Sequence, residues 1–204
     1  MSSSAATRHA WPHHGGVHEW TSPNGGSFSS AANWNPSAGV GANDTARFDL
    51  GDETYVVTFP NITHQSQQLI IGDDAVTFAL DNASYEVGAT VIVGEAAGTT
   101  FPVGFFADTG TLTIQESVLQ AGTVILGLAS TEFGDVQIRS EGTLNVDGSG
   151  GDARLEFASS LRVGSSGSGV LNITDGGEMT ARSSSNNPFV FLGQNDSGVG
   201  TVNV

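Results

Sequence analysis

Gly142-Thr143-Leu144-Asn145-Val146 returns along the chain as Gly169-Val170-Leu171-Asn172-Ile173 and as Gly200-Thr201-Val202-Asn203-Val204. In each copy an apolar residue alternates with a polar one. This period of two indicates a strand with one buried face. Related copies stand at 110–114 and 134–138. A sequence that repeats one strand pattern in this way predicts a repetitive β structure.

We expect the apolar side chains of these copies to point into a core and to stack from one copy to the next. They are Leu112, Ile114, Leu144, Val146, Leu171, Ile173, Val202 and Val204. The residues between them should point to the opposite face. They are Thr113, Asn145, Asn172 and Asn203.

A second motif consists of strand-forming residues followed by Gly, and it occurs at 69–72, 91–94, 124–127, 161–164 and 190–193. We expect the leading Gly of each pentapeptide to supply the positive φ that a sharp corner requires. No helical periodicity separates the strands. The predicted fold is therefore all-β, a right-handed parallel β-solenoid with an aromatic N-terminal cap. An antiparallel β-sandwich, which also has many short strands, is the alternative.

Charge excludes several classes of partner. The chain of 204 residues has 21 acidic against 6 basic residues, a net charge of −15. Such a chain is repelled by phosphate backbones and by anionic lipid, so we expect no nucleic-acid partner and no docking on anionic lipid. The chain has no run of about 18 apolar residues, so we expect no membrane insertion. Without cysteine there can be neither disulfides nor thiolate chemistry.

Composition divides the chain into three parts. Residues 1–16 are a polar, His-rich tail, and 17–60 are an aromatic block. The solenoid repeats occupy 61–204. We expect Trp20, Trp34, Phe48 and Phe59 of the aromatic block to cap the first strands, because aromatic side chains bury the most area per residue.

The aromatic block resembles a known family. Trp20 to Phe28, Ala32-Asn33-Trp34 and Asn43 to Phe48 are similar to the N-terminal block of bacterial secreted β-strand-repeat surface proteins. These are the autotransporter-associated β-strand repeat and PEP-CTERM-type proteins of planctomycetes and related bacteria. The resemblance covers about residues 17–204 and implies an exported right-handed β-solenoid at the cell surface. The start of the chain lacks the apolar core of a signal peptide.

Two groups of residues are candidates for metal binding. Asp147, Asp152, Asp175 and Glu178 stand in Gly-rich loops, where carboxylates and carbonyls could bind Ca²⁺. Solvated corner loops are the alternative. His9, His13, His14 and His18 could bind Zn²⁺, Cu²⁺ or Ni²⁺, although a solvated tail explains them as well.

We do not expect an enzyme. A polysaccharide lyase needs basic groups on one face, and the repeats offer only Arg139, Arg154, Arg162 and Arg182. Hydrolysis needs a carboxylate pair such as Asp135 with Glu141 or Asp152 with Glu156, which any acidic chain provides. The sequence favours an extracellular structural or adhesive protein. A carbohydrate-active β-helix enzyme or polysaccharide-binding module is the alternative.

We also expect self-association. The residues 201–204 form a strand with no closing polar segment, and such a strand can serve as a template for another. Docking of the N-terminal block or tail of a second copy would be head to tail and would give filaments or a surface layer. Salt and Ca²⁺ should promote it, since the chain is strongly acidic. A longer parent protein whose further repeats cover this end is the alternative.

Overall fold

A computed structural model of the chain describes residues 15–95, 109–128, 141–165, 167–182, 188–195 and 198–204. The described residues form strands and two short 3₁₀ helices, η1 (Ala31–Asn33) and η2 (Gly148–Gly150). Sheet A contains β3 (Trp34–Asn35), β1 (Val17–Trp20), β4 (Thr45–Phe48), β6 (Thr63–Ile71), β8 (Ser84–Glu95), β10 (Val118–Leu128), β12 (Arg154–Val163), β14 (Glu178–Ala181) and β15 (Phe189–Leu192). Sheet B contains β2 (Gly26–Ser27), β5 (Thr54–Thr58), β7 (Ala75–Ala79), β9 (Thr109–Gln115), β11 (Glu141–Asp147), β13 (Ser168–Thr174) and β16 (Val199–Asn203).

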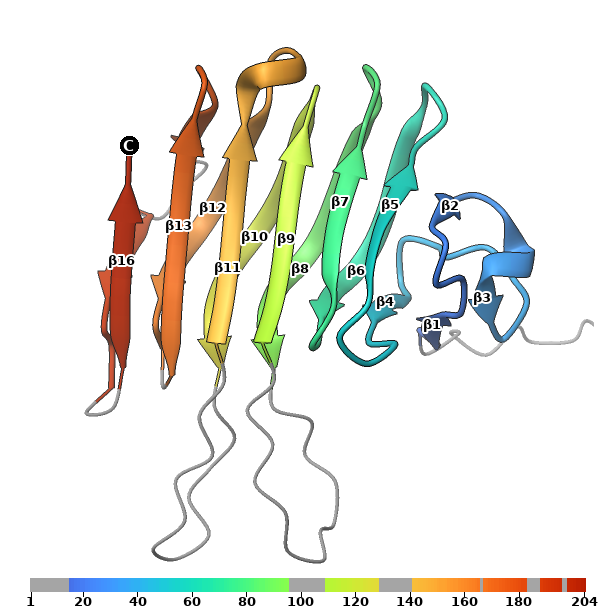
Figure 1. Cartoon of the computed structure of the whole chain (residues 1–204), viewed down its shortest axis with the longest axis horizontal. Coiled ribbons are helices and arrows are strands. Elements are labelled where there is room, and N and C mark those ends of the chain that lie inside the picture. The colour runs from blue at the N-terminus through green and yellow to red at the C-terminus, as the bar shows by residue number, and fades with distance from the viewer. Residues whose placement is uncertain (1–14, 96–108, 129–140, 166, 183–187, 196–197) are drawn as a thin grey trace, which may run out of the picture.

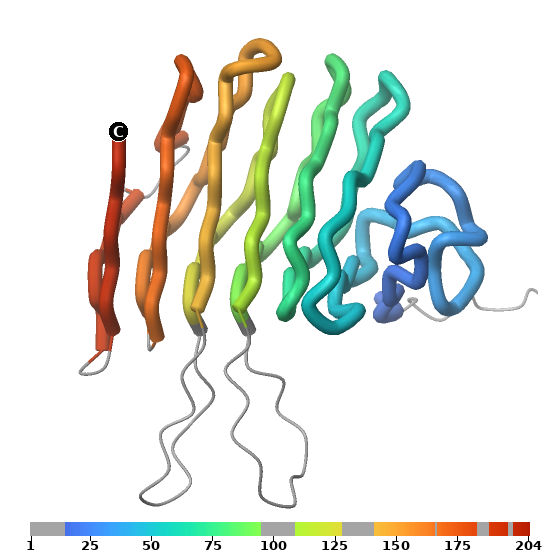
Figure 2. Tube along the Cα trace, viewed as in Figure 1, coloured from blue at the N-terminus to red at the C-terminus, as the bar shows by residue number. Residues whose placement is uncertain are grey.

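From β4 to β14 successive strands of the chain alternate between the two sheets. Sheet B lies in front in Figure 1 and sheet A behind it, and the chain advances steadily from one end to the other (Figures 1 and 2). Each strand pairs in parallel with the preceding strand of its own sheet. The two sheets together thus form a stack of repeating levels. We call one level, which is a strand of sheet A with its neighbour in sheet B, a rung.

The all-β class and the parallel pairing are confirmed. The prediction of an antiparallel sandwich is wrong, because neighbouring strands of each sheet run parallel and pair in register. Among the described residues the exception is the short strand β3, which pairs antiparallel with β1 and makes sheet A a mixed sheet.

The core consists of apolar rows that run through the stack. In sheet B one row joins Tyr55, Val76, Leu112, Leu144, Leu171 and Val202, and in sheet A another joins Phe48, Ile71, Val93, Leu126, Val163 and Leu192. The expected inward residues from Leu112 to Leu171 are fully buried. Ile173 and Val202 are partly buried. Val204 was expected inside and is 99% exposed, because it follows β16 at the edge of the sheet.

Glycines fix the corners between the sheets, but not in the way expected. The positive φ lies instead at the Gly at or beside the end of four sheet-A strands, namely Gly94, Gly127, Gly164 and Gly193, and it is 71° at both Gly94 and Gly164. The leading Gly of the pentapeptide is needed for space instead. A Cβ on Gly142 would lie 2.0 Å from the Val93 carbonyl oxygen, so only glycine lets the two strands turn this closely.

Aromatic side chains fill the N-terminal end of the stack. The expected capping residues Trp20, Trp34, Phe48 and Phe59 are all buried. The Trp20 and Trp34 rings meet edge to face, with centroids 5.0 Å apart, and Trp34 donates to the Phe28 carbonyl. These aromatics belong to the same hydrophobic cluster as the repeats, so the core continues across the expected boundary at residue 60.

Candidate functional site

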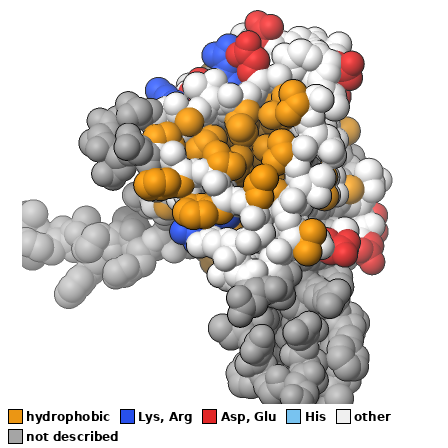
Figure 3. Space-filling model, turned by 90° about the vertical axis from the view of Figure 1, so that its left-hand side faces the viewer, with side chains coloured by type: hydrophobic (Ala, Val, Ile, Leu, Met, Phe, Trp, Pro, Cys, Tyr) orange, Lys and Arg blue, Asp and Glu red, His pale blue; other side chains and the backbone are white. Residues whose placement is uncertain are grey.

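The apolar rows of the core emerge at the C-terminal end of the stack. There the last core-facing residues of sheet A, Val190 and Leu192, are 51% and 55% exposed, while their row neighbours Leu161 and Val163 are fully buried. The whole apolar end is visible in Figure 3. We call it the C-terminal end face, and its exposed or half-exposed residues are Phe189, Val190, Phe191, Leu192, Val199, Val202 and Val204.

The strands at this end each have one free edge among the described residues. The strands β14 and β15 both pair with β12, and β16 pairs with β13. Their outer edges have no strand beside them in the part of the chain that the structure describes. A free edge presents backbone N–H and C=O groups that can pair with a further strand.

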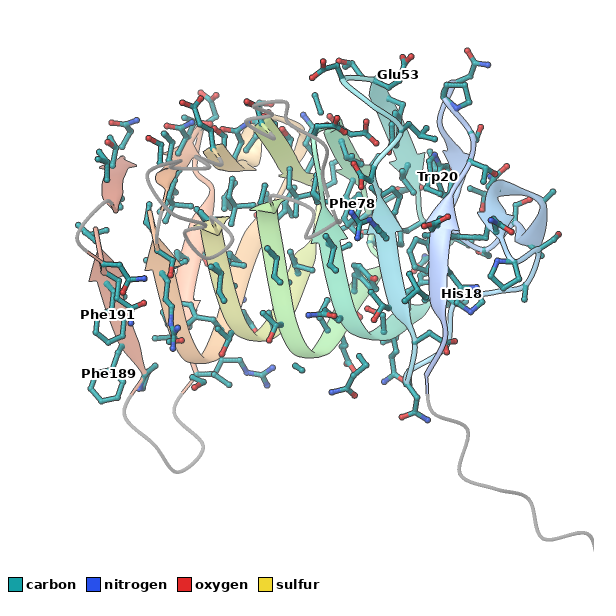
Figure 4. All side chains as sticks on the ribbon, turned by 90° about the horizontal axis from the view of Figure 1, so that it is seen from below. His18, Trp20, Glu53, Phe78, Phe189 and Phe191 are labelled. Carbon is teal, nitrogen blue, oxygen red and sulfur yellow. The ribbon has the colours of Figure 1, made fainter. Side chains whose placement is uncertain are left out.

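Phe189 and Phe191 widen the apolar end beyond the core. They continue the outward rows of sheet A and are 58% and 37% exposed, with ring centroids 6.1 Å apart. In Figure 4 both rings project from β15 at the end of the stack. A contiguous exposed patch of large apolar side chains is typical of an interaction site.

A ladder of side-chain amides reaches the same end. Asn145 donates to the Thr113 hydroxyl at 3.1 Å, and Asn172 donates to the Asn145 amide oxygen at 2.8 Å. Asn203 donates to the Asn172 oxygen at 2.7 Å. This outward orientation confirms the prediction for these four residues. Each amide donates towards the N-terminal end, so a further rung could donate to the oxygen of Asn203.

Ion pairs lie on the outer face of sheet A near this end. Arg154 pairs with Glu178 at 2.7 Å, and Arg182 pairs with Glu156 at 3.2 Å. Arg182 also donates to Gln120. Arg154, Arg182 and Glu156, which were considered for catalysis from the sequence, therefore take part in ion pairs. Asp135 and Arg139 lie outside the described residues.

The calcium candidates are not gathered into one group. Asp147 accepts hydrogen bonds from the Ser149 amide and from Gln115, which hold its pKa below the usual range of a carboxyl. Glu178 is paired with Arg154. Asp152 and Asp175 are exposed in separate turns. In the described ranges no three His, Asp or Glu side chains are placed to hold a metal ion.

Of the four clustered histidines, the structure describes His18 alone. Its ring is buried, and its Nε2 lies 3.5 Å from the Asp44 carboxylate. Asp44 is itself held by the backbone amides of Gly16 and Gly41. His18 thus joins β1 to the loop before β4. His9, His13 and His14 lie outside the described residues.

A buried carboxylate that sequence reasoning missed organises the turn between β4 and β5. Asp74 is fully buried and accepts hydrogen bonds from the Leu50 and Glu53 amides and from the Tyr55 hydroxyl. Beside it, burial and the neighbouring Asp49 raise the pKa of Asp73 to about 6. The partners are distant in sequence, so no local motif marks them.

The surroundings of these groups explain their role. The described donors to the Asp74 carboxylate lie within the turn and the adjacent strand, and burial raises the pKa of Tyr55 above its ordinary value. The cluster stabilises the turn and leaves the C-terminal end face as the candidate functional site.

No helix in the described ranges is long and apolar enough to cross a membrane. No protein-family profile, curated protein or solved structure was found to match the chain.

Proposed function

We propose that the chain is a non-catalytic structural protein, a right-handed parallel β-solenoid that self-associates through its C-terminal end face. The observation that carries the proposal is the exposure of the core rows at Val190 and Leu192 beside free strand edges. Burying this apolar surface against a like surface would be favourable, at roughly 25 cal/mol for each Å² removed from water. An extracellular setting rests on the resemblance of the aromatic block to secreted surface proteins.

The partner that this face fits best is a second copy of the chain. A second copy that meets this face would cover the ends of the apolar rows and pair with the edges of β15 and β16. The C-terminal end of a second copy offers such edges and apolar rows. Two equal faces could then meet around a twofold axis, which gives a closed dimer.

Head-to-tail filaments are less favoured by the two ends of the stack. At the N-terminal end the outermost described strands, β2 and β3, have two residues each, and Pro36 directly after β3 has no N–H to donate. The aromatic side chains there are buried rather than offered to a partner. A filament grows to many copies of the chain, whereas a closed dimer stops at two. One measurement of the mass of the assembly therefore separates them.

Analytical ultracentrifugation over a wide range of protein concentration tests the proposal. We expect reversible association to a dimer, which strengthens with salt because a net charge of −15 opposes it. Leu192→Lys should weaken association. Ile62→Lys is the matched control, because Ile62 is 60% exposed and lies far from the C-terminal end face.

Three results would count against this assembly. A monomer at every concentration and salt level, with or without Ca²⁺, would overturn self-association. Equal weakening by Leu192→Lys and Ile62→Lys would overturn the assignment of the face. Species that grow without limit would replace the closed dimer with a filament.

A further inference from the structure

Sheet B carries on its outer face an uncharged array of short side chains, which lies between the charged outward residues Glu141 and Asp147 of β11. Two outward rows cross its six long strands, from β5 to β16, in unbroken register. One row holds Thr54, Ala75, Thr111, Thr143, Val170 and Thr201, and the other holds Val56, Thr77, Thr113, Asn145, Asn172 and Asn203. All twelve side chains are partly or fully exposed, and none is charged.

The absence of charge from these two rows contrasts with the ion pairs on sheet A. The outer face of sheet A carries the Arg154–Glu178 and Arg182–Glu156 ion pairs and a contact between Gln65 and Glu86. A chain with a net charge of −15 has thus kept its ionic groups off two complete rows of one sheet. Two neutral rows fit a neutral partner and offer no cation to phosphate or to a charged polysaccharide.

The array is also regular in two dimensions. Parallel strands lie about 4.8 Å apart, and alternate residues on one strand about 6.6 Å apart, so six strands present a lattice about 24 Å long. The side chains are held in place, since threonine is stiff at χ1 and the amides are joined by the Thr113–Asn145–Asn172–Asn203 ladder. Figure 1 looks directly onto this face, where the six strands lie side by side.

We propose that the outer face of sheet B binds crystalline water, that is, the surface of ice. Hexagonal ice presents oxygen atoms at repeats of similar size along its two principal axes. Ordered threonine and asparagine groups can hold bridging waters in that pattern, and methyl groups fill the gaps between them. Ions are rejected from the ice lattice, which agrees with the uncharged rows. No aromatic side chain occurs among the twelve, so a sugar would have no stacking platform there.

Measurements of thermal hysteresis and of protein uptake into a growing ice surface test this assignment. We expect the purified chain to lower the freezing point without lowering the melting point, and to concentrate in the ice. Thr143→Tyr, at the centre of the face, should reduce both effects at least twofold. Thr123→Tyr is the matched control, because Thr123 is an equally half-buried outward residue of β10 on sheet A.

Several outcomes overturn the proposal. They are no thermal hysteresis and no uptake for the original chain, or equal losses in the two variants. Circular dichroism at 4 °C establishes that both variants are folded, and Thr143→Val, which keeps the shape, serves if Thr143→Tyr does not fold. Binding of the chain to insoluble neutral polysaccharide, lost in Thr143→Tyr and without ice uptake, would assign the face to sugar instead. Self-association concerns the other surface, so its failure leaves this assignment unchanged.

Discussion

The Tyr55 hydroxyl donates a 2.6 Å hydrogen bond to the carboxylate of Asp74, which has no exposure to solvent. The same carboxylate accepts the backbone amides of Leu50 and Glu53, so one side chain closes the turn that joins the first long strands of the two sheets. A buried charge is tolerated only when it is hydrogen-bonded in this way. The turn therefore depends on each of its donors.

Removing the Tyr55 hydroxyl should destabilise the fold. Tyr55→Phe leaves a buried carboxylate with one donor fewer, and we expect a loss of about 1–3 kcal/mol in the free energy of unfolding. Urea denaturation followed by tryptophan fluorescence measures it. Tyr85→Phe is the control, because the Tyr85 hydroxyl contacts the neutral Ser66 hydroxyl. A loss in Tyr55→Phe no larger than in Tyr85→Phe would contradict the role of Asp74.

The carboxylate of Asp73 should make stability depend on pH. Its pKa is raised to about 6, first by burial and then by Asp49 and Asp74, so the folded chain binds a proton more tightly than the unfolded chain does. The resulting stabilisation is complete below about pH 4 and is lost as pH rises through about 6. Asp73→Asn should therefore raise the melting temperature at pH 7 and change it little at pH 4.

Two measurements make this pH prediction specific. Asp52→Asn removes one charge at an exposed position of the neighbouring turn between β4 and β5, and it should leave the difference between pH 4 and pH 7 unchanged. Titration of Asp73 by NMR gives its pKa directly. An ordinary carboxyl pKa at Asp73 would contradict the prediction.

The corner glycines should not tolerate a methyl group. In Gly142→Ala the new Cβ would lie 2.0 Å from the Val93 carbonyl oxygen, and the backbone must shift to relieve the clash. We expect a loss of several kcal/mol or failure to fold, as is typical when a well-packed interior is overfilled. Gly39→Ala is the control, since no atom lies within 4 Å of its Cβ. Equal melting temperatures of Gly142→Ala and Gly39→Ala would show that the corner at Gly142 has room for a methyl group.

The amide ladder should contribute modestly to stability. Asn172→Ala removes both the bond to Asn145 and the bond from Asn203, and each half-exposed bond should contribute roughly 0.5–1.5 kcal/mol. Thr111→Ala, on the same face but in the neighbouring row, should have a smaller effect. Thermal denaturation compares the two, and equal losses would show that the ladder adds nothing beyond strand propensity.

Alternation along the pentapeptides predicts which side chains enter the core, with Val204 as the exception. The strand around Leu144 and Val146, its inward residues and the outward Asn145 all follow from a period of two. Periodicity does not state which strand lies beside which, so it left the sandwich open. Periodicity also does not predict the hydrogen bond between Tyr55 and Asp74, because these residues are 19 positions apart. The prediction of a positive φ at the leading Gly of each pentapeptide was wrong. The positive φ lies at glycines such as Gly94, on the other side of the corner, and motif spacing alone does not distinguish the two positions.

The exposed end was only half predictable. The sequence indicates the strand at 201–204 as a template, but it does not single out Phe189 and Phe191 as part of the exposed end. Their pattern is that of a buried strand, and only the position of β15 in the last rung leaves them exposed. Neighbours in space, rather than neighbours in sequence, decide the burial of a residue in a stack.

The bonding of each rung to the rung before it has a consequence for the order in which the molecule folds. Each ladder asparagine bonds to a partner made 27 to 32 residues earlier. A ribosome adds about 5–20 residues each second, so a rung is completed every few seconds. Loops close and hairpins form within microseconds, so each new strand meets a finished template. The chain can thus fold as it is synthesised, with each completed rung acting as the template for the next.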